Sequence, residues 1–202
     1  MNIAIMGSGK GSNAEAIFSA IADGALPAKV VALLSDVPDA GILRQGARYG
    51  INGTYIDAGP YRTKLDGPGE QRYLDALLAS GADTVVLAGF MRIIKHGLLK
   101  AFPNRIVNIH PSLLPAFPGL DAWRQALDYG VKVTGCTVHL VDEGTDTGPI
   151  LEQMAVPVRN DDTAESLHAR IQVCEHRIYP SALRRLATGS LRFQGRRLVA
   201  IH

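Results

Sequence analysis

The residues best suited to chemistry lie within residues 108–115, which read NIHPSLLP. Side chains two positions apart on an extended strand point to the same face, so Asn108 and His110 are expected to project together at a strand's end. Pro111 disfavours a helical conformation at His110, and two further prolines keep the next residues irregular. A hydrogen-bond donor beside a proton-transfer group at the mouth of a loop indicates a catalytic site. The alternative is a buried pair in which each side chain satisfies the other.

A glycine-rich run at residues 7–13 follows the first apolar segment and opens the first helical pattern. Glycines permit a tight turn, and free N–H groups at the start of a helix can bind phosphate. The spacing is not that of a Walker A sequence, and Ser12 stands where a dinucleotide-binding loop has its third glycine. The run is interpreted either as an anion-binding loop or as a plain turn between strand and helix.

A third candidate is the acidic loop at residues 141–149. Acidic turns are usually solvated, and this loop lacks the spacing of a calcium-binding loop. Its functional interpretation requires a carboxylate within about 4–6 Å of His110, which would favour the imidazolium and raise the pKa of that histidine. Glu175 borders an apolar helical stripe and is either a boundary position or a ligand contact. The remaining histidines that we considered are interpreted as structural or exposed: His96, His139, His168 and His176.

The composition predicts one compact domain over residues 1–202. The chain is 47% hydrophobic and 20% charged, as soluble globular proteins are. A net charge of +2 is too small to indicate nucleic acid or a membrane surface, and favours small anionic ligands. Cys136 and Cys174 lack metal-ligand spacing and are interpreted as core thiols. Without a basic leader or an apolar run of about 18 residues, the protein is expected to be cytoplasmic.

Apolar segments and helical patterns alternate along the first half of the chain. Strands are expected at 2–6, 29–34, 54–57, 83–88 and 105–109, and helices at 13–22, 41–49, 70–79 and 97–101. This predicts a doubly wound α/β fold with a mostly parallel sheet flanked by helices, with ligands at the carboxyl ends of the strands. Segments 132–141 and 151–158 predict an antiparallel extension in the C-terminal half. Asp162 and Glu165 suggest a capping box for a following helix, and a terminal hairpin is expected around residues 194–195.

Five motifs, at residues 11–13, 88–94, 108–115, 135–139 and 175–180, occur in an order that closely resembles the phosphoribosylglycinamide formyltransferase family. These are folate-dependent enzymes of purine biosynthesis, and the resemblance covers nearly the whole chain. It implies transfer of a formyl group from 10-formyltetrahydrofolate to the amine of glycinamide ribonucleotide, without a metal. It also implies small-molecule partners only, no nucleic acid and no membrane. The expected assembly is a monomer or a weak homodimer.

The resemblance assigns roles to individual residues. Asn108 and His110 match the catalytic pair, and Asp146 matches the aspartate that tunes the histidine. The substrate-binding residues implied are Gly11, Ser12, Asn13 and Glu175, the first three as a cradle for the ribose phosphate. The folate-binding residues implied are Lys64, Met91, Arg92, Ile93, Ile94, Asn108, Val141, Asp142, Glu143, Gly144 and Asp146. Lys64, with Arg62 as the alternative, stands where the family has an arginine for the folate tail.

The expected chemistry is direct attack of the amine on the formyl carbon. Asn108 and protonated His110 would stabilise the oxyanion, each well-placed donor contributing about 3–4 kcal/mol. The imidazole would also shuttle protons, directly or through water. One departure is that Asp121 and Trp123 fall in a segment where many members carry histidine, which puts an accessory proton role for that segment in doubt.

Three other functions remain open. A formyl hydrolase would use water in place of the amine, and its relatives carry an added N-terminal domain. A methionyl-tRNA formyltransferase would need a further C-terminal domain and a basic surface. From a different class, a nucleotide-binding regulatory module could keep the fold without turnover. The set Asn108, His110 and Asp146 argues against this last interpretation.

Overall fold

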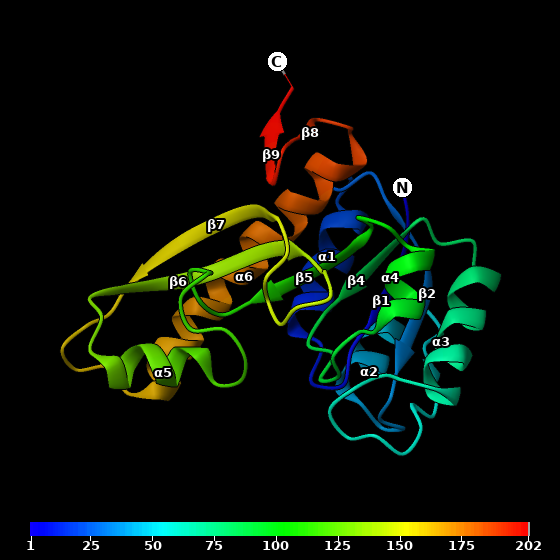
Figure 1. The fold of residues 1–202 in the computed structure, drawn as a ribbon, viewed down its shortest axis with the longest axis horizontal. Coiled ribbons are helices and arrows are strands. Elements are labelled where there is room, and N and C mark those ends of the chain that lie inside the picture. Colours follow the sequence, from blue (N-terminus) through cyan, green and yellow to red (C-terminus); the bar gives the residue numbers. More distant parts are fainter. Residues whose placement is uncertain (202) are drawn as a thin grey trace.

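A seven-stranded sheet, in the order β3-β2-β1-β4-β5-β6-β7, forms the centre of the protein in a computed structural model that describes residues 1–201 (Figure 1). The pairings among β1 to β5 are parallel, whereas β6 pairs antiparallel with both β5 and β7. The predicted fold class is therefore confirmed. The strands of this sheet are β1 (Asn2–Met6), β2 (Lys29–Ser35), β3 (Thr54–Tyr55), β4 (Thr84–Leu87), β5 (Ile106–His110), β6 (Val133–Leu140) and β7 (Ile150–Pro157).

Helices cover both faces of this sheet. They are α1 (Ser12–Ala22), α2 (Gly41–Arg48), α3 (Pro68–Ala79), α4 (His96–Ala101), α5 (Ala122–Tyr129) and α6 (Ala164–Ala187). Alternate residues of β1 enter different cores: Ile3 and Ile5 pack in a cluster that includes residues of α1 and α6, and Ala4 and Met6 in one that includes residues of α3 and α4. Burial on both faces explains why the parallel strands are apolar throughout.

Helix α6 ties the sheet together at the point where the site forms. The hydroxyl of Tyr179, fully buried on this helix, lies 2.9 Å from the carbonyl oxygen of Leu87 and 3.1 Å from that of Val107. The predicted capping box is wrong in its residues, because Thr163 caps the helix and exchanges hydrogen bonds with Ser166. Asp162 instead accepts a hydrogen bond from the Ser166 hydroxyl.

Other differences from the expected elements are local. The third strand covers two residues rather than four, and α3 begins at Pro68, earlier than expected, with Gly67 at its N-cap (φ 58°). Helix α5 was not predicted. It follows Asp121, whose backbone is left-handed (φ 53°), and it is short at eight residues.

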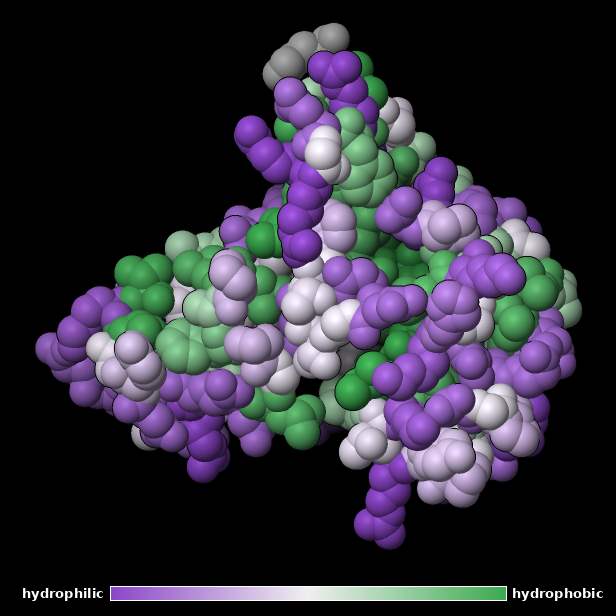
Figure 2. Space-filling view, viewed as in Figure 1, coloured by the Kyte–Doolittle hydropathy of each residue, from purple (hydrophilic) through white to green (hydrophobic). Residues whose placement is uncertain are grey.

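The C-terminal hairpin is confirmed as β8 (Leu191–Gln194) paired antiparallel with β9 (Arg197–Ala200). It projects from the body of the protein at the end of α6 (Figure 1). At its turn, the Arg196 guanidinium donates to the carbonyl oxygen of Thr147, in the loop after β6. Hydrophilic residues cover much of the face in Figure 2, and hydrophobic residues lie among them on both sides of the molecule. No helix within residues 1–201 is long and apolar enough to cross a membrane.

Candidate active site

The carboxyl end of β5 opens into a cavity of about 470 Å³. Asn108 and His110 both line it, as their spacing predicted, and His110 is almost completely buried (5% exposed). The other walls come from the segment after β4, the segment before α5 and the loop after β6. The lining residues from these segments include Gly89, Met91, Arg92, Ile93, Ile94, Gly119, Leu120, Asp121, Trp123, Val141, Asp142, Gly144, Asp146 and Thr147.

Hydrogen-bond acceptors face both ring nitrogens of His110. Nδ1 lies 3.3 Å from Oδ2 of Asp146, and Nε2 lies 2.8 Å from the carbonyl oxygen of Phe117. A neutral imidazole carries only one N–H and would leave one of these acceptors facing a lone pair. Only a doubly protonated ring could donate to both oxygens, and the Asp146 carboxylate lies within ion-pair distance of Nδ1.

Asn108 is oriented by a histidine on the neighbouring strand. His139 lies opposite Asn108 in the antiparallel pairing of β5 with β6, and its Nε2 is 3.3 Å from Nδ2 of Asn108. Nδ1 of His139 donates to the carbonyl oxygen of Leu140 (2.9 Å), and burial lowers the pKa of His139. In this neutral tautomer Nε2 accepts one amide hydrogen of Asn108, which leaves the second hydrogen for another acceptor.

Asp146 lies between the two histidines and is held by a backbone N–H. Its Oδ2 accepts a hydrogen bond from the backbone N–H of Gly119 (2.9 Å), and its Oδ1 lies 3.6 Å from Nε2 of His139. The residue adopts a left-handed backbone (φ 55°), which non-glycine residues adopt rarely. The loop conformation thus brings the carboxylate to His110, as the functional interpretation of the acidic loop required.

Only some residues of the acidic loop line the cavity. Val141, Asp142 and Gly144 line the cavity together with Asp146. Glu143 instead points to solvent and forms a 3.2 Å ion-pair contact with His96, both side chains being more than three-quarters exposed (78% and 77%). The carboxylate of Asp142 is used within the loop, accepting hydrogen bonds from Gly144 and Thr147.

The glycine-rich loop meets α6 beside the cavity. Gly11 has a left-handed backbone (φ 85°), and a Cβ there would lie 2.6 Å from Cα of Ile42, so only glycine fits. Nδ2 of Asn13 donates to Oε2 of Glu175 (2.9 Å), while Oδ1 of Asn13 is buried without a partner in the described structure. Glu175 is 4% exposed, and burial raises the pKa of its carboxyl group. Ser12 is the first residue of α1.

The residues assigned to folate binding differ in their exposure to solvent and in their contacts. Met91 is 61% exposed, whereas Ile94 is buried. Arg92 is paired with Asp36, Nε to Oδ2 at 2.6 Å, and it also donates to the carbonyl oxygen of Tyr61. Lys64 does not line the cavity, although its neighbour Thr63 does; the Lys64 ammonium is 2.6 Å from Oδ2 of Asp66.

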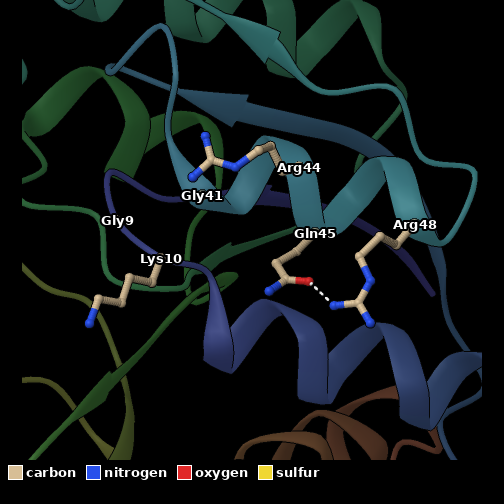
Figure 3. A pocket seen from close by; sticks show the side chains of 6 residues that line it. All are labelled: Gly9, Lys10, Gly41, Arg44, Gln45 and Arg48. Atoms are coloured by element: carbon tan, nitrogen blue, oxygen red, sulfur yellow. Dashed lines mark hydrogen bonds between the residues drawn. The ribbon is translucent and has the colours of Figure 1, made fainter.

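A second hollow, of about 560 Å³, lies between the glycine-rich loop and α2 (Figure 3). Lys10, Arg44 and Arg48 make it basic, but their charged groups do not converge: in Figure 3 Lys10 and Arg44 extend away from Arg48. Arg48 is occupied by Glu15 and Gln45, at 3.0 and 2.8 Å. The convergence of partners on His110 identifies the cavity at β5 as the candidate active site.

No group of three or more potential metal ligands occurs among residues 1–201. The acceptors around His110 and the amide of Asn108 are instead suited to stabilising an oxyanion and to moving protons. Sequence reasoning treated His139 as structural or exposed and did not anticipate the backbone contacts of Phe117 and Gly119. His139 lies on β6, which pairs with β5. Its position beside Asn108 could be predicted only if that pairing were already known.

The site thus combines an α/β sheet, an Asn-x-His sequence at the end of β5 and a carboxylate on the loop after β6. Residues 1–183 match the family model described as formyl transferase. The chain therefore belongs to the formyl transferase family, and the resemblance inferred from the sequence motifs is confirmed.

Individual relatives narrow the class. The chain is 42% identical over 183 residues to phosphoribosylglycinamide formyltransferase of Bacillus subtilis (strain 168), covering 91% of this chain and 93% of the relative. It is 43% identical over 199 residues to the enzyme of the same name from Mycobacterium tuberculosis (strain ATCC 25618 / H37Rv), covering 96% and 88%. The crystal structure of glycinamide ribonucleotide transformylase 1 from Symbiobacterium toebii superposes with a TM-score of 0.95 at 46% identity, covering 100% of this chain and 94% of that one.

Proposed function

We propose that this protein transfers a formyl group from 10-formyltetrahydrofolate to the amine of glycinamide ribonucleotide, a step of purine biosynthesis. The observation that carries the proposal is the meeting of Asn108, His110 and Asp146 at one wall of the cavity, with His110 3.3 Å from the carboxylate. The names of the relatives, and the formyl transferase family itself, support the same reaction.

The reaction begins with attack of the substrate amine on the formyl carbon. A C–N bond forms, and the carbonyl electron pair moves to the oxygen. The amide hydrogen of Asn108 that His139 does not use is the proposed donor to this oxyanion, and the cationic ring of His110 stabilises the same charge. Collapse of the tetrahedral intermediate breaks the bond to the folate nitrogen, giving tetrahydrofolate and formylglycinamide ribonucleotide. No covalent enzyme intermediate is needed, because the amine is the nucleophile.

Two proton transfers accompany these bond changes. The attacking amine loses a proton, and the departing folate nitrogen gains one. His110 is the proposed shuttle, directly or through a bound water. Asp146 keeps the ring charged before transfer, because its carboxylate lies against Nδ1.

The substrates are proposed to enter from opposite sides of this centre. The phosphate of glycinamide ribonucleotide would bind at Gly11, Ser12 and Asn13, where the start of α1 has no side-chain cap. The unpartnered Oδ1 of Asn13 and the carboxylate of Glu175 would accept hydrogen bonds from the same substrate.

The folate would occupy the cavity along residues 91–94, with the loop of residues 141–146 closing over it. Its anionic tail would lie towards Lys64, which must then exchange Asp66 for the ligand. Arg62 is the alternative contact. A lysine would bind the tail carboxylate as a point charge rather than as a bidentate fork.

The decisive experiment is a formyl-transfer assay on purified protein with three acceptors: glycinamide ribonucleotide, water and methionyl-tRNA. We expect turnover with glycinamide ribonucleotide alone. Water must be tested as an acceptor because a related fold belongs to a hydrolase. A formyltetrahydrofolate deformylase from Pseudomonas syringae pv. tomato superposes with a TM-score of 0.90 at 25% identity, and this chain covers 66% of it. Release of formate without transfer to the amine would replace the proposal with hydrolysis.

Three accompanying predictions rest on the same proposal. The folate is a co-substrate and no metal takes part, so chelators should leave turnover unchanged. The protein acts in the cytoplasm as a monomer or weak homodimer. Residues 1–202 form a single formyltransferase domain, of which 1–183 match the family model.

A further inference from the structure

We propose that Trp123 and His168 are a positioning pair for formyl transfer, whose stacked rings hold in place the backbone segment that fixes His110 and Asp146. The kinetic test of this inference rests on the proposed function. Its structural test, by spectroscopy of the aromatic rings, does not. The two rings lie face to face, with centroids 3.7 Å apart and planes inclined by 1°. Trp123 comes from the start of α5 and His168 from α6, so the contact joins elements far apart in the chain.

The segment of residues 117–121 contacts both His110 and Asp146 through main-chain atoms. The carbonyl oxygen of Phe117 accepts from Nε2 of His110, and the N–H of Gly119 donates to Asp146. Neither contact depends on a side chain of the segment. The orientation of the His110 ring therefore depends on where this stretch of backbone lies.

That backbone adopts an unfavourable conformation. Within five residues, Phe117 and Asp121 have left-handed φ values of 52° and 53°, on either side of Gly119, whose φ of 84° carries no steric cost for glycine. Residues with a Cβ rarely adopt this region, and they keep it only where surrounding contacts fix the chain. An external support is therefore required.

Helix α5 supplies part of this support, and the stack anchors α5. Nε2 of Gln125 donates to the carbonyl oxygens of Pro118 and Leu120, and the ring of Tyr129 packs against Phe117 with centroids 5.7 Å apart. Helix α5 has only eight residues, too few to be stable alone in water. Its packing on α6 through Trp123 adds to the burial of Ala122 and Ala126, and we infer that this packing helps to fix the segment.

The surroundings of His168 keep the stack uncharged near neutral pH. Asp121 and Lys10 are the charged groups that face the ring, and burial lowers the pKa of His168. Two neutral rings stack without an ion pair between them. Trp123 lines the cavity, whereas His168 does not, so a change at His168 tests the support of the backbone of residues 117–121 without removing a lining side chain.

The test uses Trp123 as its own reporter, because it is the single tryptophan of the chain. His168→Ala is expected to expose one face of the indole and shift its emission to longer wavelength. In the same variant we expect kcat to fall about 10- to 100-fold with the KM of both substrates nearly unchanged, because the reacting groups are misplaced while the binding surfaces remain. Trp123→Phe should restore most of the activity that Trp123→Ala loses, since a phenyl ring can still stack.

Val173→Ala is the matched control on the same helix, since this side chain is 51% exposed. It should leave emission and kcat at the parent values. A His168→Ala variant that shows the emission shift but keeps the parent kcat would overturn the proposal. So would a loss of kcat no greater than that of Val173→Ala, or a rise in KM alone.

A substrate-free measurement separates this inference from the proposed reaction. The ring resonances of His110, titrated by NMR, should move in His168→Ala and stay fixed in Val173→Ala. If the parent transfers no formyl group but the His110 titration moves, the proposed function fails and the positioning pair stands. If turnover is present and the titration does not move, the positioning pair fails alone.

Discussion

The two hollows beside the glycine-rich loop differ in how their polar groups are arranged. Between α1 and α2, Arg48 is paired with Glu15, and the Arg44 guanidinium donates to the carbonyl oxygen of Asp39. At the end of β5, Asn108, His110 and Asp146 line one cavity, and each has a neighbour that fixes its side chain. The difference teaches that an accumulation of charge does not define a site. Polar groups that converge, each oriented by a fixed partner, do.

Replacing His110 by alanine should have the largest effect on the cavity at β5. We expect turnover to fall by about 10²–10⁴-fold, as general acid–base catalysis is lost together with the cation at the oxyanion. Binding of a folate analogue, measured by titration calorimetry, should be nearly unchanged. Parent-level turnover in this variant would remove the basis for choosing this cavity over the hollow at α2.

Asp146→Asn tests the role of charge in the cavity at β5, because it removes the carboxylate charge and preserves the shape of the side chain. The amide still fits the loop but no longer stabilises the imidazolium of His110, so the limb of the pH–rate profile that belongs to this histidine should move to lower pH. Turnover at neutral pH should drop by less than in His110→Ala. A profile of unchanged position, measured over the full pH range of stability, would reject the charge-stabilising role.

Glu175→Gln tests the buried carboxylate next to the glycine-rich loop. Burial raises the pKa of Glu175, so the folded state favours its protonated form, and stability is lost as pH rises through the folded pKa. The variant should therefore melt at a higher temperature than the parent at neutral pH, with the difference vanishing in acid. Its KM for glycinamide ribonucleotide should rise. Thermal scans at several pH values would detect the opposite order if the carboxylate were stabilising.

Arg48→Ala should have the smallest effect and serves as the contrast. Its ion pair with Glu15 is exposed, with 66% of the Arg48 side chain accessible, and such pairs contribute at most about 1 kcal/mol to stability. Turnover and both KM values should stay within about twofold of the parent. This change is much smaller than the loss of kcat expected when a donor to the oxyanion is removed. A tenfold loss of activity would show that the basic hollow takes part in the reaction.

Local patterns predicted much of the fold, because period and apolarity reflect burial directly. Strands such as β1 and β5 and helices such as α1 were found within a residue or two of their ends. The spacing of Asn108 and His110 likewise predicted their common face. Helix α5 was missed because its apolar face is short, and only Ala122 and Ala126 are buried.

The rest of the site depends on contacts that no local pattern contains. His139 meets Asn108 only through the antiparallel pairing of β5 with β6. Helix α6 is capped by Thr163 rather than by its neighbour Asp162. Both residue types are good caps, so the sequence alone does not show at which of the two the helix begins. The stack of Trp123 on His168 joins two residues whose proximity follows from the packing of whole helices.

Main-chain atoms of Phe117 and Gly119, rather than their side chains, contact His110 and Asp146. Every residue has a carbonyl oxygen, so this contact does not restrict the side chain at position 117. The N–H at position 119 excludes only proline, but the φ of 84° there favours glycine. Substitutions along this stretch are therefore limited by the backbone conformation that they must adopt rather than by side-chain chemistry.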